Sequence, residues 1–202
     1  HTVASRDVKD LALSDVNGDG LLDLLAGGQD PFSTTGDHLT VSVNAGVNGD
    51  GTFSGFLAST SVLLGQDHWA LSLATGALDG DGDKDVVVGS AASFADVAIN
   101  DGAGGLTVSH STTTPTYAAP GLPNIVPLSI SSVDVGDIDE DGNQDIAVAF
   151  TNDTRHSTWI LPGNGDGTFD PEVRYSFGDG VIALAIGDID GDSHPDVAAA
   201  AT

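Results

Sequence analysis

Asp137-Ile-Asp-Glu-Asp-Gly-Asn-Gln-Asp145 decides the fold, because its pattern of acidic residues and glycine recurs three more times in the sequence. The last residues of successive copies are 62, 60 and 51 residues apart. A pattern that returns at nearly constant spacing indicates a chain built from structural repeats. The four copies are named by their order in the chain: the first loop (15–23), the second loop (77–85), the third loop (137–145) and the fourth loop (188–196).

Each loop is flanked by short apolar stretches that are typical of β-strands, such as Val86-Val-Val88 after the second loop. A third strand and a glycine-rich turn follow, as in Thr158–Leu161 and Asn164–Phe169, and Val173–Phe177 then supplies a fourth strand. Asn-Gly and Asp-Gly are strong hairpin signals, since both turn positions must accept a positive φ. One repeat therefore predicts a four-stranded antiparallel meander, which is the blade of a β-propeller. A β-sandwich would explain the alternation but not the period.

The expected fold is all-β, a single propeller region over residues 1–202 with about four blades and an incomplete last one. His1–Ser5 is expected to form an outermost strand, and Ser111–Pro127, rich in Thr, Pro and Ala, to form an inserted loop. The repeats run roughly over residues 6–62, 63–124, 125–178 and 179–202.

The chain resembles FG-GAP/VCBS repeats, through the acidic loops, the Asp85-Val-Val-Val-Gly89 strand and the Gly163–Phe169 stretch. Such repeats build integrin-α-like β-propellers, and the resemblance covers nearly the whole chain. It implies calcium in the loops and a scaffold that is secreted or displayed at the cell surface. It does not imply one activity, since the family includes adhesion receptors, lectins and domains attached to lyases and hydrolases.

The loop pattern also predicts calcium by its own chemistry. Side chains at positions 1, 3, 5 and 9 and the backbone carbonyl at position 7 supply only oxygen ligands, which suit Ca²⁺. An EF-hand is excluded, because no bidentate glutamate stands at position 12. The expected ligands are Asp15, Asn17, Asp19, Leu21 and Asp23; Asp79, Asp81, Asp83 and Asp85; Asp137, Asp139, Asp141, Asn143 and Asp145; and Asp188, Asp190, Asp192, His194 and Asp196.

The four loops are not equivalent in this prediction. The first and third loops have every side-chain ligand and the glycine at position 6, whereas the fourth has Ser193 at that position. The second loop has Ala77 at position 1 and is expected to be the weakest site. We therefore expect up to four Ca²⁺ ions that stabilise the blades rather than take part in catalysis.

Composition narrows the possible functions. The formal net charge is -25, with 5 Lys and Arg against 30 acidic residues, of which all but Glu140 and Glu172 are aspartate. This charge opposes binding to nucleic acid, which needs a basic surface. No apolar run is long enough to span a membrane. The chain has no cysteine, which excludes thiol catalysis, and no Gly-x-Ser-x-Gly motif that would support a hydrolase triad. We expect no enzyme activity.

The sequence thus predicts a calcium-binding, secreted or cell-surface propeller module with a structural or adhesive role and a possible glycan or protein ligand. The alternatives are a carbohydrate-binding lectin propeller and a non-catalytic propeller domain of a secreted polysaccharide-active enzyme. Since Val197-Ala-Ala199 is only the second strand of its repeat, the last blade has open edges. We expect these edges to form a homo-oligomer or filament, or to join the remainder of a longer propeller.

Overall fold

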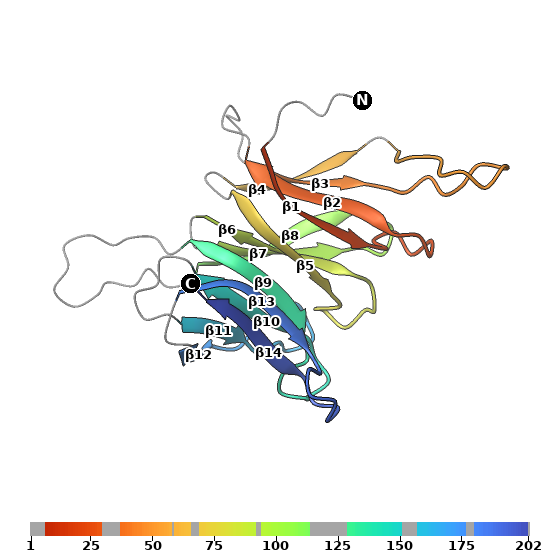
Figure 1. Cartoon of the computed structure of the whole chain (residues 1–202). Coiled ribbons are helices and arrows are strands. Elements are labelled where there is room, and N and C mark those ends of the chain that lie inside the picture. Colours follow the sequence, from red (N-terminus) through yellow and green to blue (C-terminus); the bar gives the residue numbers. More distant parts are fainter. Residues whose placement is uncertain are drawn as a thin grey trace.

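The computed structural model describes residues 7–29, 37–57, 59–65, 69–91, 94–113, 129–150, 157–176 and 180–201. These residues form three four-stranded antiparallel sheets and one two-stranded sheet, placed side by side (Figure 1). The all-β propeller-blade architecture is therefore confirmed. Sheet 1 contains β1 (Asp7–Ser14), β2 (Asp23–Gln29), β3 (Asp37–Ser42) and β4 (Thr60–Gly65); sheet 2 contains β5 (Ala70–Gly76), β6 (Asp85–Ser90), β7 (Phe94–Asn100) and β8 (Leu106–Thr113); sheet 3 contains β9 (Ile130–Gly136), β10 (Asp145–Phe150), β11 (Ser157–Leu161) and β12 (Val173–Ser176); sheet 4 contains β13 (Val181–Gly187) and β14 (Asp196–Ala201).

Each four-stranded sheet is the predicted meander, with strands adjacent in chain order and an acidic loop between its first two strands. Two details differ from the expectation. β4 extends to Gly65, past the approximate repeat boundary at residue 62, and residues 111–113 of the expected inserted loop belong to β8. The expected strand at residues 1–5 and residues 114–127 lie outside the described residues.

A β-bulge recurs at the same place in the first strand of every sheet. The pairing with the second strand skips one residue, which is Lys9, Leu71, Ser131 or Ile182. A bulge adds one residue to one strand and locally increases its twist. Its recurrence shows that the four first strands share one irregular geometry, which a simple two-residue alternation does not predict.

The hydrophobic core consists of layers between sheets. One cluster joins sheet 1 to sheet 2 through residues such as Leu25, Leu39 and Val86. A second cluster joins sheet 2 to sheet 3 through residues such as Val97 and Phe150. β6 and β10 are buried along their whole length because both of their faces lie against neighbouring sheets.

The first strands of adjoining sheets are also linked by polar contacts. The Asp10 carboxylate accepts a hydrogen bond from the Leu73 backbone N–H at 2.8 Å. The Ser72 hydroxyl accepts one from the Val133 N–H, and Ser132 accepts one from Leu184, each at 3.1 Å. The same contact occurs at each of the three junctions, so all neighbouring sheets pack in one register.

Candidate metal centres

The ninth residue of each of the first three acidic loops is a buried aspartate that connects parts of its sheet. Asp145 accepts two backbone hydrogen bonds at 2.8 Å, one from Ile138 at position 2 and one from Gly163 after β11. Asp85 makes the same pair of contacts with Leu78 and Asn100. The carboxylate thereby connects the start of the loop to the end of the third strand. Asp23 repeats the arrangement with Val16 and Asn44 in the first loop.

The loop itself folds through short-range hydrogen bonds from its own aspartates. In the third loop, Asp137 at position 1 accepts from the Gly142 N–H, and Asp139 accepts from the Asp141 N–H. Short aspartate side chains favour such turns because they reach a backbone N–H only a few residues away. The second loop lacks the first of these contacts, since alanine stands at position 1.

Positions 4 and 6 of every loop have a positive φ, and two of these residues are not glycine. Ser193, at position 6 of the fourth loop, has φ 74°, as its alignment with the other loops predicts. Glu140, at position 4 of the third loop, has φ 62°. Its carboxylate contacts the His194 ring of the fourth loop within hydrogen-bonding distance. Sequence reasoning missed this pair, although both residues interrupt an otherwise regular pattern.

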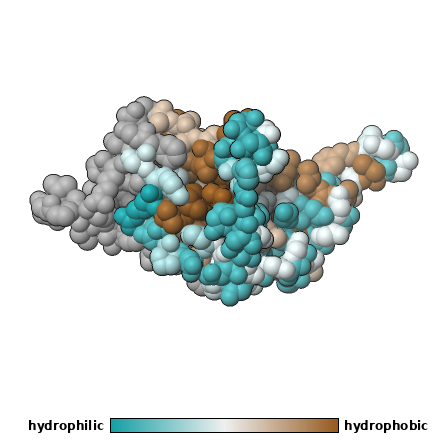
Figure 2. All heavy atoms as spheres, turned by 90° about the horizontal axis from the view of Figure 1, so that it is seen from below, coloured by the Kyte–Doolittle hydropathy of each residue, from teal (hydrophilic) through white to brown (hydrophobic). Residues whose placement is uncertain are grey.

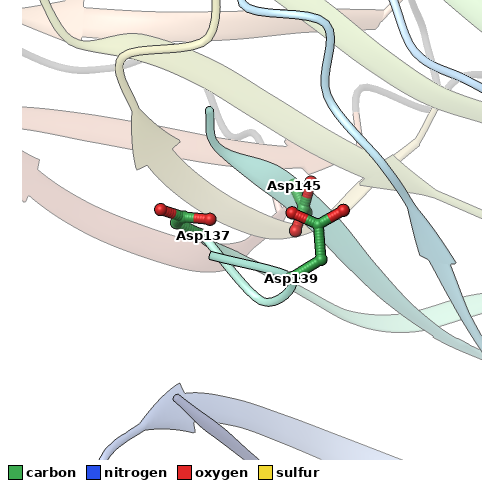
Figure 3. A group of neighbouring side chains, drawn as sticks. All are labelled: Asp137, Asp139 and Asp145. Atoms are coloured by element: carbon green, nitrogen blue, oxygen red, sulfur yellow. The ribbon is translucent and has the colours of Figure 1, made fainter. Parts of the chain in front are cut away.

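Three expected ligands come together in each of two loops. One ligand oxygen from each of Asp137, Asp139 and Asp145 lies within 4.8 Å of the others, and Figure 3 shows Asp137 and Asp139 at the loop and Asp145 at the start of β10. Asp188, Asp190 and Asp196 form the same group in the fourth loop. These are positions 1, 3 and 9. In the first loop they are Asp15, Asn17 and Asp23, and in the second they are Ala77, Asp79 and Asp85, so only two carboxylates remain in each.

The position-5 carboxylates Asp141 and Asp192 are not part of these two carboxylate groups. The position-5 carboxylate accepts a hydrogen bond from the position-7 backbone N–H, as in Asp141 and Asn143 at 2.8 Å. The position-7 side chain of Asp83 or Asn143 lies against a glycine of its own sheet, Gly102 or Gly165. Asp19 and Leu21, Asp81 and Asp83, and Asp192 and His194 repeat the contact between positions 5 and 7.

The third loop carries uncompensated charge. Burial raises the pKa of the Asp145 carboxyl, and the negative charge of Asp139 raises it further, although hydrogen bonds from Gly163 and Ile138 act in the opposite direction. Asp137 Oδ1 is buried and has no hydrogen-bond partner. A cation that prefers oxygen ligands would offset this charge and satisfy the unpartnered oxygen with the smallest free-energy cost.

A hairpin from the next sheet covers each of the first two loops. The Asn100 side chain donates a hydrogen bond to the Val16 carbonyl at 2.8 Å, and the Gly167 N–H donates one to the Leu78 carbonyl at 3.0 Å. Val16 and Leu78 are each 1% exposed as a result. This contact between sheets was not predicted. Its sequence signal is the Asn-Gly-Asp-Gly-Thr-Phe169 turn, which reads as a hairpin but does not identify the loop that it covers.

The third loop borders an apolar pocket of about 210 Å³. The pocket is lined by Ile138, Thr158, Ile160, Tyr175 and Val197. The pocket has neither a histidine nor a carboxylate among these described lining residues. Trp159 lies outside it, buried beneath the Arg174 guanidinium at 4.4 Å. A carbohydrate-binding lectin site would be expected to present an exposed tryptophan ring beside a pocket, and neither Trp69 nor Trp159 is among the described residues that line this one.

Four acidic loops at equivalent places in four sheets agree with the comparison to known families. The FG-GAP-like repeat matches three times, over residues 15–88, 78–148 and 137–199. The chain belongs to this family. The predicted FG-GAP resemblance is thus confirmed across most of the sequence. None of the curated proteins gives a significant match.

Solved structures with this fold include two to which the FG-GAP-like chain is distantly similar. One is BBS1N in complex with ARL6DN, soaked with lead, at 14% identity and a TM-score of 0.59 over 96% of this chain and 50% of the other. The second is an Agrocybe aegerita lectin that recognises non-reducing terminal N-acetylglucosamine, at 23% identity and a TM-score of 0.55 over 93% and 45%. The chain spans about half the length of these neighbours, and the likeness concerns the fold.

Proposed function

We propose that this FG-GAP-like chain is a calcium-binding propeller module with a structural or adhesive role in a secreted or cell-surface protein. The observation that carries the proposal is the buried, unpartnered Oδ1 atom of Asp137 beside the carboxylates of Asp139 and Asp145. An ionised carboxylate oxygen removed from water without a partner is costly. A bound Ca²⁺ would satisfy it and offset the repulsion among the three carboxylates.

The ligand chemistry favours Ca²⁺ over other common cations. The group offers only oxygen atoms on a flexible loop, which suits the large and variable coordination shell of Ca²⁺. Mg²⁺ requires a more regular octahedral shell, and zinc prefers nitrogen or sulfur ligands. Calcium sites in extracellular modules are often weak, with dissociation constants near the millimolar calcium outside cells. A location outside the cell would therefore supply enough free calcium for a site of this kind.

A structural role follows from the position of the ligands. Asp145 belongs to β10 and connects the loop to Gly163, two residues after β11, so an ion on this carboxylate would link three parts of one sheet. An ion that binds only the folded chain stabilises it by mass action, by about 2.7 kcal/mol per site at a free concentration one hundred times the dissociation constant. The net charge of -25 adds repulsion that bound cations would reduce.

Calorimetric titration with Ca²⁺ and with Mg²⁺, together with thermal unfolding in Ca²⁺ or in chelator, tests this proposal. We expect Ca²⁺ to bind and to raise the unfolding midpoint, with a much smaller effect of Mg²⁺. Asp139→Asn should weaken binding, whereas Asp170→Asn, which removes one exposed charge outside the loops, should not. Equal midpoints in Ca²⁺ and chelator would refute the proposal.

A further inference from the structure

The hairpin that covers the second loop also contacts the third loop, which belongs to its own sheet. This sheet 3 hairpin (163–169) begins at Gly163, whose N–H donates a hydrogen bond to Asp145 at 2.8 Å. Gly165 lies so close to the Asn143 side chain that a Cβ atom on the glycine would collide with the amide oxygen. Asn143 and Asp145 are positions 7 and 9 of the third loop. The third loop therefore holds the start of this hairpin in place.

The same hairpin contacts positions 2, 3 and 4 of the second loop. The Gly167 N–H donates a hydrogen bond to the Leu78 carbonyl at 3.0 Å. Gly167 also lies beside Asp79, since a Cβ atom on this glycine would be in van der Waals contact with the Asp79 side chain. The Gly165 carbonyl faces Gly80, where a Cβ atom would lie only 2.8 Å from it. One hairpin thus touches expected ligands, or their neighbours in the chain, in two loops.

The junction between sheets 1 and 2 repeats this arrangement. The Asn100 N–H donates to Asp85 of the second loop at 2.9 Å, and Gly102 lies against the Asp83 side chain of the same loop. The Asn100 side chain also donates to the Val16 carbonyl of the first loop. The connection between successive loops is therefore a repeated feature of the fold and not a single contact.

The hairpin of sheet 1 has the same sequence in a different environment. Residues 48–53 are identical to the last six residues of the sheet 3 hairpin. They belong to an arm (43–57) that projects from sheet 1 (Figure 1), and hydrophobic residues are visible along it in Figure 2. The Gly51 N–H stands where Gly167 stands in the other hairpin, but it donates to Asn48 of its own turn at 2.9 Å. The N–H at this position therefore reports whether the hairpin is bound to a loop.

We propose that the sheet 3 hairpin couples the second and third loops, so that cation binding by either loop raises the affinity of the other. The proposal rests on the calcium binding proposed above and adds an interaction between two sites. A cation on Asp145 restricts the motion of this carboxylate and of the hairpin that is bonded to it. The second loop then contacts a hairpin that is already ordered, so its own binding has a smaller entropy cost. By thermodynamic linkage, the second loop has the same effect on the third.

Gly80 and Gly18 provide a matched pair of positions for breaking this connection. Both are position 4 of their loops, with φ of 79° and 70°. A Cβ atom at Gly80 would collide with the Gly165 carbonyl, whereas at Gly18 it would make an ordinary contact with the Gly102 carbonyl at 3.7 Å. Gly80→Ala should therefore displace the hairpin of the next sheet, and Gly18→Ala should not. The backbone strain of the two substitutions is similar.

NMR titration of the whole isotope-labelled chain with Ca²⁺ measures the two sites separately. The amide signals of Gly82 and Gly142, at position 6, report on the second and third loops. We expect Gly80→Ala to weaken binding by the third loop about five-fold, although this residue belongs to another sheet, and Gly18→Ala to leave it nearly unchanged. Asp137→Ala should weaken binding by the second loop by a similar factor. Circular dichroism verifies that the variants are folded.

Amide hydrogen exchange tests the same connection without a substitution in the second loop. Ca²⁺ should slow exchange of the buried Gly167 N–H by about five-fold or more, because it stabilises the hairpin against the second loop. Exchange of Gly51, in the hairpin of identical sequence, should change much less. Asp137→Ala should remove most of the slowing at Gly167.

Equal affinities of the third loop in Gly80→Ala and Gly18→Ala would overturn the coupling, and so would a Gly167 exchange rate that Ca²⁺ changes no more than that of Gly51. In both cases the calcium proposal itself would stand, because Gly142 would still respond to Ca²⁺. A chain in which no loop responds to Ca²⁺ would overturn both proposals.

Discussion

The second and third loops occupy the same place in neighbouring sheets but differ in their first residue. Both end in a buried aspartate, Asp85 or Asp145, that accepts two backbone hydrogen bonds and has a pKa raised by burial. The third loop begins with Asp137, which completes a group of three carboxylates, whereas the second begins with Ala77. The same strand geometry therefore forms with or without the complete acidic group.

The difference between Ala77 and Asp137 at position 1 separates two roles of the acidic motif, one in building the sheet and one in attracting a cation. The ninth residue builds the sheet, because its two oxygens satisfy backbone N–H groups that would otherwise be buried without partners. The residues at positions 1 and 3 are not needed for that connection. In the third loop they add negative charge that favours a cation. Substitutions at these positions should consequently have different dependence on calcium.

The largest effect is expected from removing the ninth residue. Asp145→Ala and Asp85→Ala should each lower the free energy of unfolding by about 2–4 kcal/mol even in chelator, because each leaves two backbone donors without a partner. Urea denaturation measures this change. Asp139→Ala, at an exposed position of the third loop, should cost less than about 1 kcal/mol in chelator. Equal losses for Asp139 and Asp145 would show that the ninth residue has no separate role.

Exchanging the first residues should exchange the calcium response of the two loops. Asp137→Ala should remove most of the stabilisation that Ca²⁺ gives through the third loop, on the order of 1–3 kcal/mol. Ala77→Asp should strengthen calcium binding by the second loop by about ten-fold, since it adds a carboxylate and an acceptor for the Gly82 N–H. Calorimetry compares these variants with wild type. If Ala77→Asp leaves binding unchanged, the first position is not a ligand.

Acidification should reveal the raised pKa values of Asp85 and Asp145. In chelator, the folded chain takes up protons on these carboxyls before the unfolded chain does, so stability increases as the pH falls toward about 3.9 from above. The gain is at most about 1.4 kcal/mol per pH unit for each group. In Ca²⁺ the sign reverses, because protons compete with the ion. Urea midpoints from neutral to mildly acidic pH measure both slopes, and identical slopes with and without Ca²⁺ would contradict this account.

The smallest effect concerns position 6, which is Gly82 in the second loop, Gly142 in the third and Ser193 in the fourth, all with positive φ. Ser193→Gly should raise the free energy of unfolding by about 0.5–1 kcal/mol, because glycine adopts this backbone conformation without steric cost. Gly142→Ser is the reverse control and should lower it by a similar amount. Thermal midpoints of the two variants should therefore move in opposite directions.

Much of this architecture could be predicted from local sequence. Strands, turns and loops repeat because alternation of apolar residues, Asn-Gly turns and closely spaced aspartates act over only a few residues. The positive φ at Ser193 could be predicted as well, because glycine occupies the same position in the other three loops. The positive φ of Glu140 in the third loop could not be predicted, since it has no local sequence signal and the side chain contacts His194 from another sheet.

The sequence by itself determined the period, the blade and the candidate ligands, since these depend on residues near one another in the chain. Tertiary structure decided which ligands meet and which residues of the loops are buried. The carboxylates at positions 1, 3 and 9 converge only because β9 and β10 hold the two ends of the third loop together. Val16 and Leu78, which both stand at position 2, are buried because a hairpin of the next sheet lies over each of them, whereas Ile189 at position 2 of the fourth loop is exposed. Burial at a given position depends on the neighbouring sheet, which the residue's own repeat does not specify.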